Sequence, residues 1–188
     1  MSQQALLTSI VEALDGDGIP YMLTWSLASS LQGEPRATHA IDLVVDIAAS
    51  DVARVTRALS APEVCLDEDA VSDATRRRTM FNLIDSSSGD KADFWLLTDD
   101  SYDRERFARR MRVEALGLEL SVSAPEDTIL MKLRWSAQAG GSEKQLNNAL
   151  RVYELQAWSL DEKYVDEWAL RLEVADALAR IRGQARAG

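Results

Sequence analysis

The chain has 188 residues, a formal net charge of −10 and a hydrophobic share of 46%. This length fits one domain, or one domain with a helical extension, and it can bury a core. The acidic balance argues against nucleic acid as a partner and against an anionic membrane surface, because both need clustered Lys and Arg. Cys65 is the only cysteine, which excludes an internal disulfide and a cysteine-rich metal site.

The sequence also bears on where the protein works. Its first residues lack the basic and apolar regions of a signal peptide. No stretch approaches the roughly 18 apolar residues of a membrane span. We therefore expect a cytoplasmic protein, and its single cysteine fits a reducing compartment.

The first part of the chain predicts helices alternating with strands. Apolar residues at helical spacing predict a helix at 3–14, and after two glycines Pro20 leads into a strand at 21–24. A short helix at 26–32 ends at Gly33. The nearly all-apolar run at 41–47 is typical of a strand covered on both faces, and Ser50 can cap a helix at 51–60.

The rest of the chain changes from mixed elements to helices. We expect a helix at 67–77, strands at 79–85 and 91–97 joined by a hairpin loop, a helix near 101–110 and a strand near 118–122. Three helices follow, begun by caps at Ser123, Ser142 and Ser159, and the last ends near Ile181. The predicted fold class is α/β (α+β), with a mixed sheet and flanking helices in domain 1–122 and a helical C-terminal subdomain at 123–188.

Residues 21–46 contain the most informative pattern. An apolar strand runs into Ser26, a short helix and a Gly-Glu-Pro-Arg turn follow, and a second apolar strand carries Asp42. A later strand carries Asp93. This arrangement resembles the signature of the nucleotidyltransferase superfamily, in which a strand ends in Gly-Gly or Gly-Ser and a later strand carries Asp-hydrophobic-Asp. The resemblance implies a nucleotidyltransferase-like mixed sheet flanked by helices.

The resemblance extends over nearly the whole chain. The chain is similar to small stand-alone bacterial nucleotidyltransferase-like proteins, which are often related to the antitoxin half of toxin–antitoxin pairs. The similar segments are 33–38, 41–45, 80–84, 92–94, 130–135 and 142–145. The resemblance implies a nucleotide or other small molecule in the cleft, and it raises a toxin as a possible protein partner.

The resemblance also assigns candidate site residues. Nucleotidyl transfer needs carboxylates that hold a divalent metal on the triphosphate. The resemblance implies that Asp42 and Asp93 hold this metal and take part in catalysis. Ser26 stands at the start of a helix, where phosphate oxygens meet backbone N–H groups. Arg36 and Thr38 either reach ligand oxygens or brace the turn. His39 adjoins the site and is either a ligand contact or an exposed loop residue.

Three positions depart from the resemblance. Trp25 stands where the family has Gly, Ala40 where it has Asp, and Asn148 where Asp is expected. The indole should fill the phosphate cradle, and the loss of one carboxylate should weaken the Mg²⁺ site. Together the changes predict a pocket receptive to an apolar or aromatic ligand, in which Trp25 either lines the pocket or fills the core. Natural drift and deliberate redesign both fit this pattern.

Three functions remain open at this point. The first is a nucleotidyltransferase-like protein whose transfer activity is impaired or lost. The second is a repurposed or engineered enzyme in which Asp42 is a general base for an aromatic substrate stacked on Trp25. The third is an antitoxin-like binding module or pseudoenzyme. Each of them uses the same scaffold.

Overall fold

The computed structural model describes residues 2–33 and 41–186 of the chain. Contacts group the protein into two compact units. The first unit comprises Met1–Leu23 and Thr38–Val122, and the second comprises Thr24–Ala37 and Ser123–Gly188. Residues 24–33 lie between two strands in the sequence, yet they group with the helices that follow residue 122. The sequence-based boundary at residue 122 instead assigns these residues to the N-terminal domain, 1–122.

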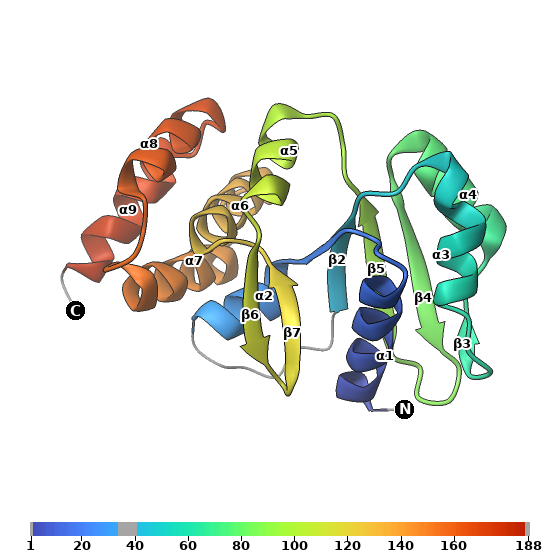
Figure 1. Cartoon of the computed structure of the whole chain (residues 1–188). Helices are drawn as coiled ribbons and strands as arrows, with labels where there is room; N and C mark the ends of the chain where they lie inside the picture. The colour runs from blue at the N-terminus through green and yellow to red at the C-terminus, as the bar shows by residue number, and fades with distance from the viewer. Residues whose placement is uncertain (1, 34–40, 187–188) are drawn as a thin grey trace. The chain divides into compact units, whose positions relative to one another are not determined.

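A mixed sheet forms the centre of the first unit. In the described part of the chain its seven strands run in the order β3-β4-β5-β2-β1-β7-β6 (Figure 1). β1 is antiparallel to β2 and parallel to β7, and β2 is parallel to β5. The strand bounds are β1 (Tyr21–Leu23), β2 (Ile41–Val45), β3 (Val64–Cys65), β4 (Met80–Asp85), β5 (Lys91–Leu96), β6 (Met111–Ala115) and β7 (Leu118–Val122).

Helices pack on both faces of this sheet, to which side chains point alternately along each strand. Met22 and Val44 form a buried cluster with Leu97 and with Phe107 of α5 (Ser101–Ala108). On the other side, α1 (Gln3–Gly16) contacts α3 (Val52–Ala58), and α4 (Glu68–Arg77) contacts both α3 and β4. A short 3₁₀ helix, η1 (Ala49–Asp51), precedes α3.

The second unit is helical throughout its described residues. Helix α2 contacts α6 and α7, and α6 in turn packs along α7 (Figure 1). At the end of α2 the backbone comes close to α7, since a Cβ added at Gly33 would lie 3.2 Å from Val152 Cγ2 and 2.7 Å from the Ser29 carbonyl oxygen. The helix bounds are α2 (Trp25–Gln32), α6 (Pro125–Gln138), α7 (Glu143–Gln156), α8 (Glu162–Arg171) and α9 (Ala175–Ala185).

The predicted α/β fold class is confirmed, with local differences, one of which is the short strand β3, which was not predicted. The third C-terminal helix expected to end near Ile181 is two helices, α8 and α9, separated at Glu173, whose φ of 59° is left-handed and interrupts helical geometry. Strand β6 was not predicted, because its alternation of Arg112 and Glu114 with partly exposed apolar residues gives no buried run. Among the described residues, none of the helices is both long and apolar enough to cross a membrane.

Candidate functional site

The structure brings Asp42 and Asp93 together on neighbouring strands. Residues 41–45 are all buried and form the strand β2, which runs parallel to β5. In this register Asp42 and Asp93 are Cα partners, so their side chains lie on the same face. The neighbouring row, with Leu43 beside Phe94, points to the opposite face, where Phe94 stacks on Phe81 at 4.8 Å.

Polar groups on β4 and β5 surround the Asp93 carboxylate. Asn82 pairs with Asp93 across the β4–β5 ladder, and its Nδ2 donates a hydrogen bond to Asp93 Oδ1. Lys91 Nζ lies 3.1 Å from Asp93 Oδ2 and forms an ion pair with it. The Asp93 side chain is 15% exposed and Asp42 is 9% exposed. Asp42, Asp93 and Asn82 thus form a row across three neighbouring strands, with side-chain oxygen atoms on one face of the sheet.

These oxygen atoms could hold a divalent cation if a bound phosphate supplied some of its remaining ligands. Within the described residues, no group of three His, Cys, Asp or Glu side chains is placed to hold a metal ion. Magnesium in phosphate-binding sites is commonly held by one or two carboxylates together with the substrate phosphates. Two aspartates on adjacent strands match this mode. The positions of Arg36, Thr38, His39 and Ala40 lie outside the residues that the structure describes.

The remaining predicted residues belong to the second unit. Ser26 lies in the first turn of α2, and Ser29 Oγ donates a hydrogen bond to its carbonyl oxygen at 3.1 Å. Asn148 is buried on α7. Because these residues and the two aspartates belong to different units, the expected convergence of Ser26, Asp42 and Asp93 on one cleft stays a prediction.

Trp25 has an unusual backbone at the start of α2. Its φ is 53°, a left-handed conformation that Gly adopts freely and that bulky residues rarely adopt. The side chain is 7% exposed, and its ring lies 4.8 Å from the ring of Trp135, centroid to centroid. The backbone at this position, where the sequence resemblance expects Gly, thus has the geometry that Gly adopts freely, although a tryptophan occupies it. Its predicted role in lining a ligand pocket remains a prediction.

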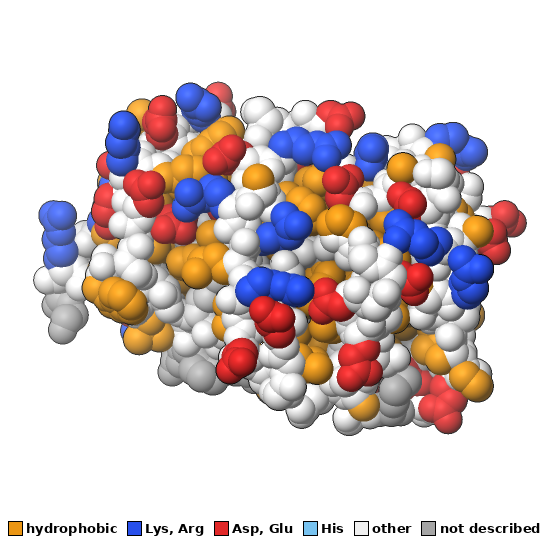
Figure 2. All heavy atoms as spheres, viewed as in Figure 1, with side chains coloured by type: hydrophobic (Ala, Val, Ile, Leu, Met, Phe, Trp, Pro, Cys, Tyr) orange, Lys and Arg blue, Asp and Glu red, His pale blue; other side chains and the backbone are white. Residues whose placement is uncertain are grey.

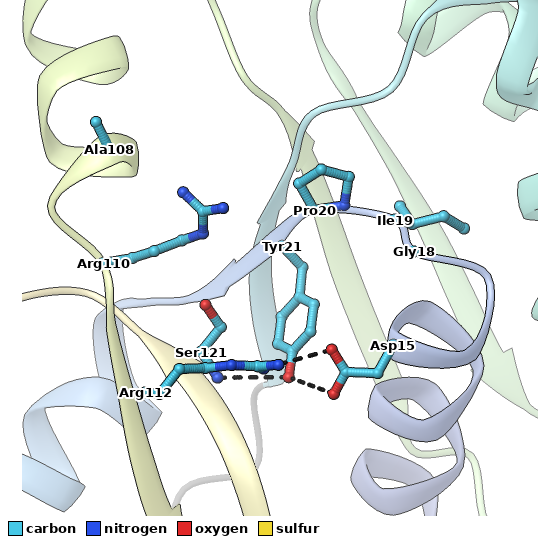
Figure 3. A pocket seen from close by; sticks show the side chains of 9 residues that line it. All are labelled: Asp15, Gly18, Ile19, Pro20, Tyr21, Ala108, Arg110, Arg112 and Ser121. Carbon is cyan, nitrogen blue, oxygen red and sulfur yellow. Dashed lines mark hydrogen bonds and ion pairs between the residues drawn. The ribbon is translucent and has the colours of Figure 1, made fainter.

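A cavity in the first unit involves residues to which the sequence gave no role. It has a volume of about 500 Å³ and lies where α1, β1, the end of α5, β6 and β7 meet (Figure 3). Arg110, Arg112 and Tyr21 are among its lining residues. The sequence offered no signal for this cavity, because the two arginines approach Tyr21 only through β6, the strand that the sequence pattern did not reveal.

Comparisons with known proteins place the fold. No family model matches the chain, and no curated protein matches it. Among solved structures, an antigenic nucleotidyltransferase-like protein from Paracoccidioides brasiliensis is similar with a TM-score of 0.60 and 17% identity, over 97% of this chain and 89% of that one.

Two structures of the antibiotic-resistance factor ANT(2″)-Ia are also similar. The complex with adenylyl-2″-tobramycin has a TM-score of 0.57 and 14% identity, over 92% of this chain and 98% of that one. The solution structure has a TM-score of 0.53 and 16% identity, over 98% and 95% of the two chains. The protein therefore has a nucleotidyltransferase-like fold, as the resemblance implied.

Proposed function

We propose that this protein is a nucleotidyltransferase-fold protein that binds a magnesium–nucleotide weakly through Asp42 and Asp93 and in which nucleotidyl transfer is impaired or lost. The observation that supports it most is the register of β2 and β5, which makes Asp42 and Asp93 neighbours on one face. Two carboxylates at paired positions of adjacent strands can together hold a divalent cation.

The surrounding side chains support a role in positioning these carboxylates. Asn82 donates to Asp93 Oδ1 and limits the rotation of that carboxylate. Lys91 offsets part of its charge from the solvent side, where the lysine side chain is half exposed. A magnesium ion bound here would supply neutralisation of the triphosphate charge. Asp42 and Asp93 would hold it, with the remaining positions left to phosphate oxygens and water.

Impaired transfer follows from the two altered positions of the motif. Ala40 supplies no carboxylate two residues before Asp42, so one of the three expected ligands is absent from the sequence. At Trp25 an indole replaces the hydrogen atom of Gly, at a backbone position whose φ of 53° is typical of Gly. Bulk at that turn keeps phosphate from the backbone N–H groups, which lowers affinity and transfer together.

The similar structures guide the choice of nucleotide. ANT(2″)-Ia is known with an adenylylated aminoglycoside, so ATP is the first nucleotide to test and CTP the comparison. Isothermal titration calorimetry with Mg²⁺ and ATP should give weak, saturable binding. Asp42→Asn should weaken this binding by about tenfold or more, because a charged ligand oxygen is lost.

A matched control removes a carboxylate elsewhere in the first unit. Asp69 lies exposed in the first turn of α4, and Asp69→Asn makes the same charge change there. It should leave Mg²⁺–ATP affinity unchanged. Equal affinity in Asp42→Asn and wild type would show that nucleotide does not use this row, and rapid transfer by the wild-type protein would show that the altered motif is competent.

A further inference from the structure

We propose that the cavity beside Arg110 is a second ligand site, for the phosphate group of a small phosphomonoester, and that it is independent of the Asp42–Asp93 row. Arg110, Arg112 and the Ser121 hydroxyl would bind the phosphate. The cavity is formed wholly within the first unit.

The cavity lies at the other end of the β1–β2 pairing from the aspartates. Tyr21 pairs with Val45, whereas Asp42 precedes Leu43, which pairs with Leu23 at the end of β1. Along strand β2, Val45 and Asp42 are three residues apart, which is about 10 Å. By alternation Asp42 and Val45 also face opposite sides of the sheet. A ligand on the aspartates would therefore not occupy this cavity.

Arg110 is a cation held in place without a carboxylate partner. Its Nη1 donates to the Phe107 carbonyl oxygen at 2.5 Å, and its guanidinium lies 4.2 Å from the centroid of the Phe107 ring. No described carboxylate forms an ion pair with it. Burial lowers the pKa of Arg110, and repulsion from Arg112 lowers it further, while Asp46 acts in the opposite sense. A bound anion would relieve both unfavourable effects.

Arg112 and Ser121 provide further donors. Among the described residues, Arg112 forms long ion pairs, 3.4 Å to Asp15 Oδ1 and 3.9 Å to Glu119 Oε1. Figure 3 shows the Ser121 hydroxyl pointing toward the space beside the Arg110 guanidinium. Asp15 opposes an anion, but both its oxygens are engaged, one by Arg112 and one by the Tyr21 hydroxyl. Two guanidinium groups therefore outweigh one carboxylate in the lining.

The surface around the cavity agrees with this charge. Figure 2 shows Lys and Arg side chains over the end of α5 and the start of β6, with Asp and Glu side chains among them. Local positive charge in an acidic protein attracts anions by focusing the field in a concave surface.

The shape and chemistry of the cavity favour a phosphomonoester. Guanidinium groups bind phosphate oxygens in pairs, with charge-assisted hydrogen bonds. The volume of about 500 Å³ exceeds what a phosphate alone needs and falls in the range of small-molecule sites. Ile19, Pro20 and the Tyr21 ring supply an apolar wall for the organic part of the ligand.

Phenyl phosphate is a suitable probe, with inorganic phosphate and benzoate beside it. Amide chemical shifts would be followed by NMR at constant ionic strength, with a chelator present to remove divalent cations. We expect saturable shifts at Gly18 and Ser121 with phenyl phosphate and weaker binding of inorganic phosphate. Tighter binding of benzoate than of phenyl phosphate would overturn phosphate as the ligand group.

Two matched variants test the assigned residues. Arg110→Gln should lower the affinity for phenyl phosphate by about tenfold, because charge-assisted hydrogen bonds are lost. Arg57→Gln makes the same charge change at an exposed residue of α3 and should not alter it. If Arg110→Gln does not fold, Ser121→Ala replaces it, with a smaller loss expected. Equal affinity in wild type and the folded cavity variant would overturn the proposal.

The same titration separates this site from the proposed nucleotide site. Asp42→Asn should leave phenyl phosphate binding unchanged, and the binding should persist without Mg²⁺. Loss of binding in Asp42→Asn would assign the phosphate to the aspartate row instead. Conversely, if the protein does not bind Mg²⁺–ATP but still binds phenyl phosphate, the proposed function is contradicted and the phosphate site in the cavity is supported.

Discussion

The indole of Trp25 packs against that of Trp135, with ring centroids 4.8 Å apart and an angle of 33° between the rings. This contact holds the start of α2 to α6 within the second unit. It also has a backbone cost, because Trp25 has a φ of 53°. A left-handed conformation costs a residue with a Cβ roughly 1–2 kcal/mol. Packing at this position therefore opposes backbone preference.

The first prediction compares two substitutions at this residue. Trp25→Gly and Trp25→Ala both remove the indole, so both lose packing and reduce the free energy of unfolding. Only Gly relieves the left-handed backbone, and we expect Trp25→Gly to be more stable than Trp25→Ala by about 1 kcal/mol. Urea denaturation of the two variants measures this difference.

The control lies one turn further along the same helix. Ala28 is buried inside α2, and Ala28→Gly should reduce stability by about 1 kcal/mol, the ordinary order of helix propensity. If Trp25→Ala is the more stable of the two Trp25 variants, as in an ordinary helix, residue 25 does not have the left-handed backbone.

The elements that the sequence predicted well are those whose pattern is local. The apolar run at Ile41–Val45 defines a buried strand, and the hairpin of β4 and β5 has alternating apolar residues on both sides of a turn. Strand β6 has no such pattern, since its residues are held by pairing with β7 rather than by burial. The cavity beside Arg110 depends on that pairing and so could not be predicted.

The two aspartates of the candidate site could be predicted from the sequence better than the backbone of Trp25. The resemblance assigned Asp42 and Asp93 to neighbouring strands of one site, and the register of β2 with β5 makes them Cα partners. The register itself depends on long-range packing, which the sequence motif does not encode. The left-handed backbone of Trp25 was also out of reach, because tryptophan gives no local indication of a positive φ.

The second prediction restores the altered motif. The double variant Ala40→Asp with Trp25→Gly returns a carboxylate two residues before Asp42 and removes the indole from the turn. Mg²⁺–ATP affinity should rise by about tenfold or more, because three carboxylates hold the cation and phosphate can approach the backbone. Calorimetric titration measures the gain. An unchanged affinity in this folded variant would mean that the pocket was never a nucleotide site.

The third prediction concerns the lysine beside Asp93. Lys91→Met removes the ion pair with Asp93 at 3.1 Å and leaves a side chain of similar length. The pair is largely exposed on the lysine side, so the stability change should be under about 1 kcal/mol. Mg²⁺ affinity should increase several-fold, roughly in line with removing one nearby positive charge.

Its control uses a lysine of the second unit. Lys144 is exposed on α7, and Lys144→Met makes the same charge change. It should leave Mg²⁺ affinity as in wild type, measured by the same titration. Weaker Mg²⁺ binding in Lys91→Met would show that the lysine positions Asp93 for the cation instead of competing with it.

The fourth prediction follows from the environment of the Tyr21 hydroxyl. Burial raises the pKa of Tyr21 above its ordinary value of 10.0, and the charge of Asp15 and the hydrogen bond to it raise it further. The Ser121 N–H and the charge of Arg112 lower it, but the net shift is upward. The folded protein therefore favours the protonated phenol, which donates to Asp15 and accepts from Ser121 N, each at 3.4 Å.

A raised pKa in the folded state gives the sign of the pH dependence. Its contribution to stability is fully present below about pH 10, the unfolded value, and is lost as the pH rises through the folded pKa. Tyr21→Phe cannot ionise. Near pH 7 it should cost about 1 kcal/mol for two long hydrogen bonds, and above pH 10 the difference from wild type should shrink. Urea denaturation across this range measures the difference, and one that stays constant would show that Tyr21 does not carry the raised pKa.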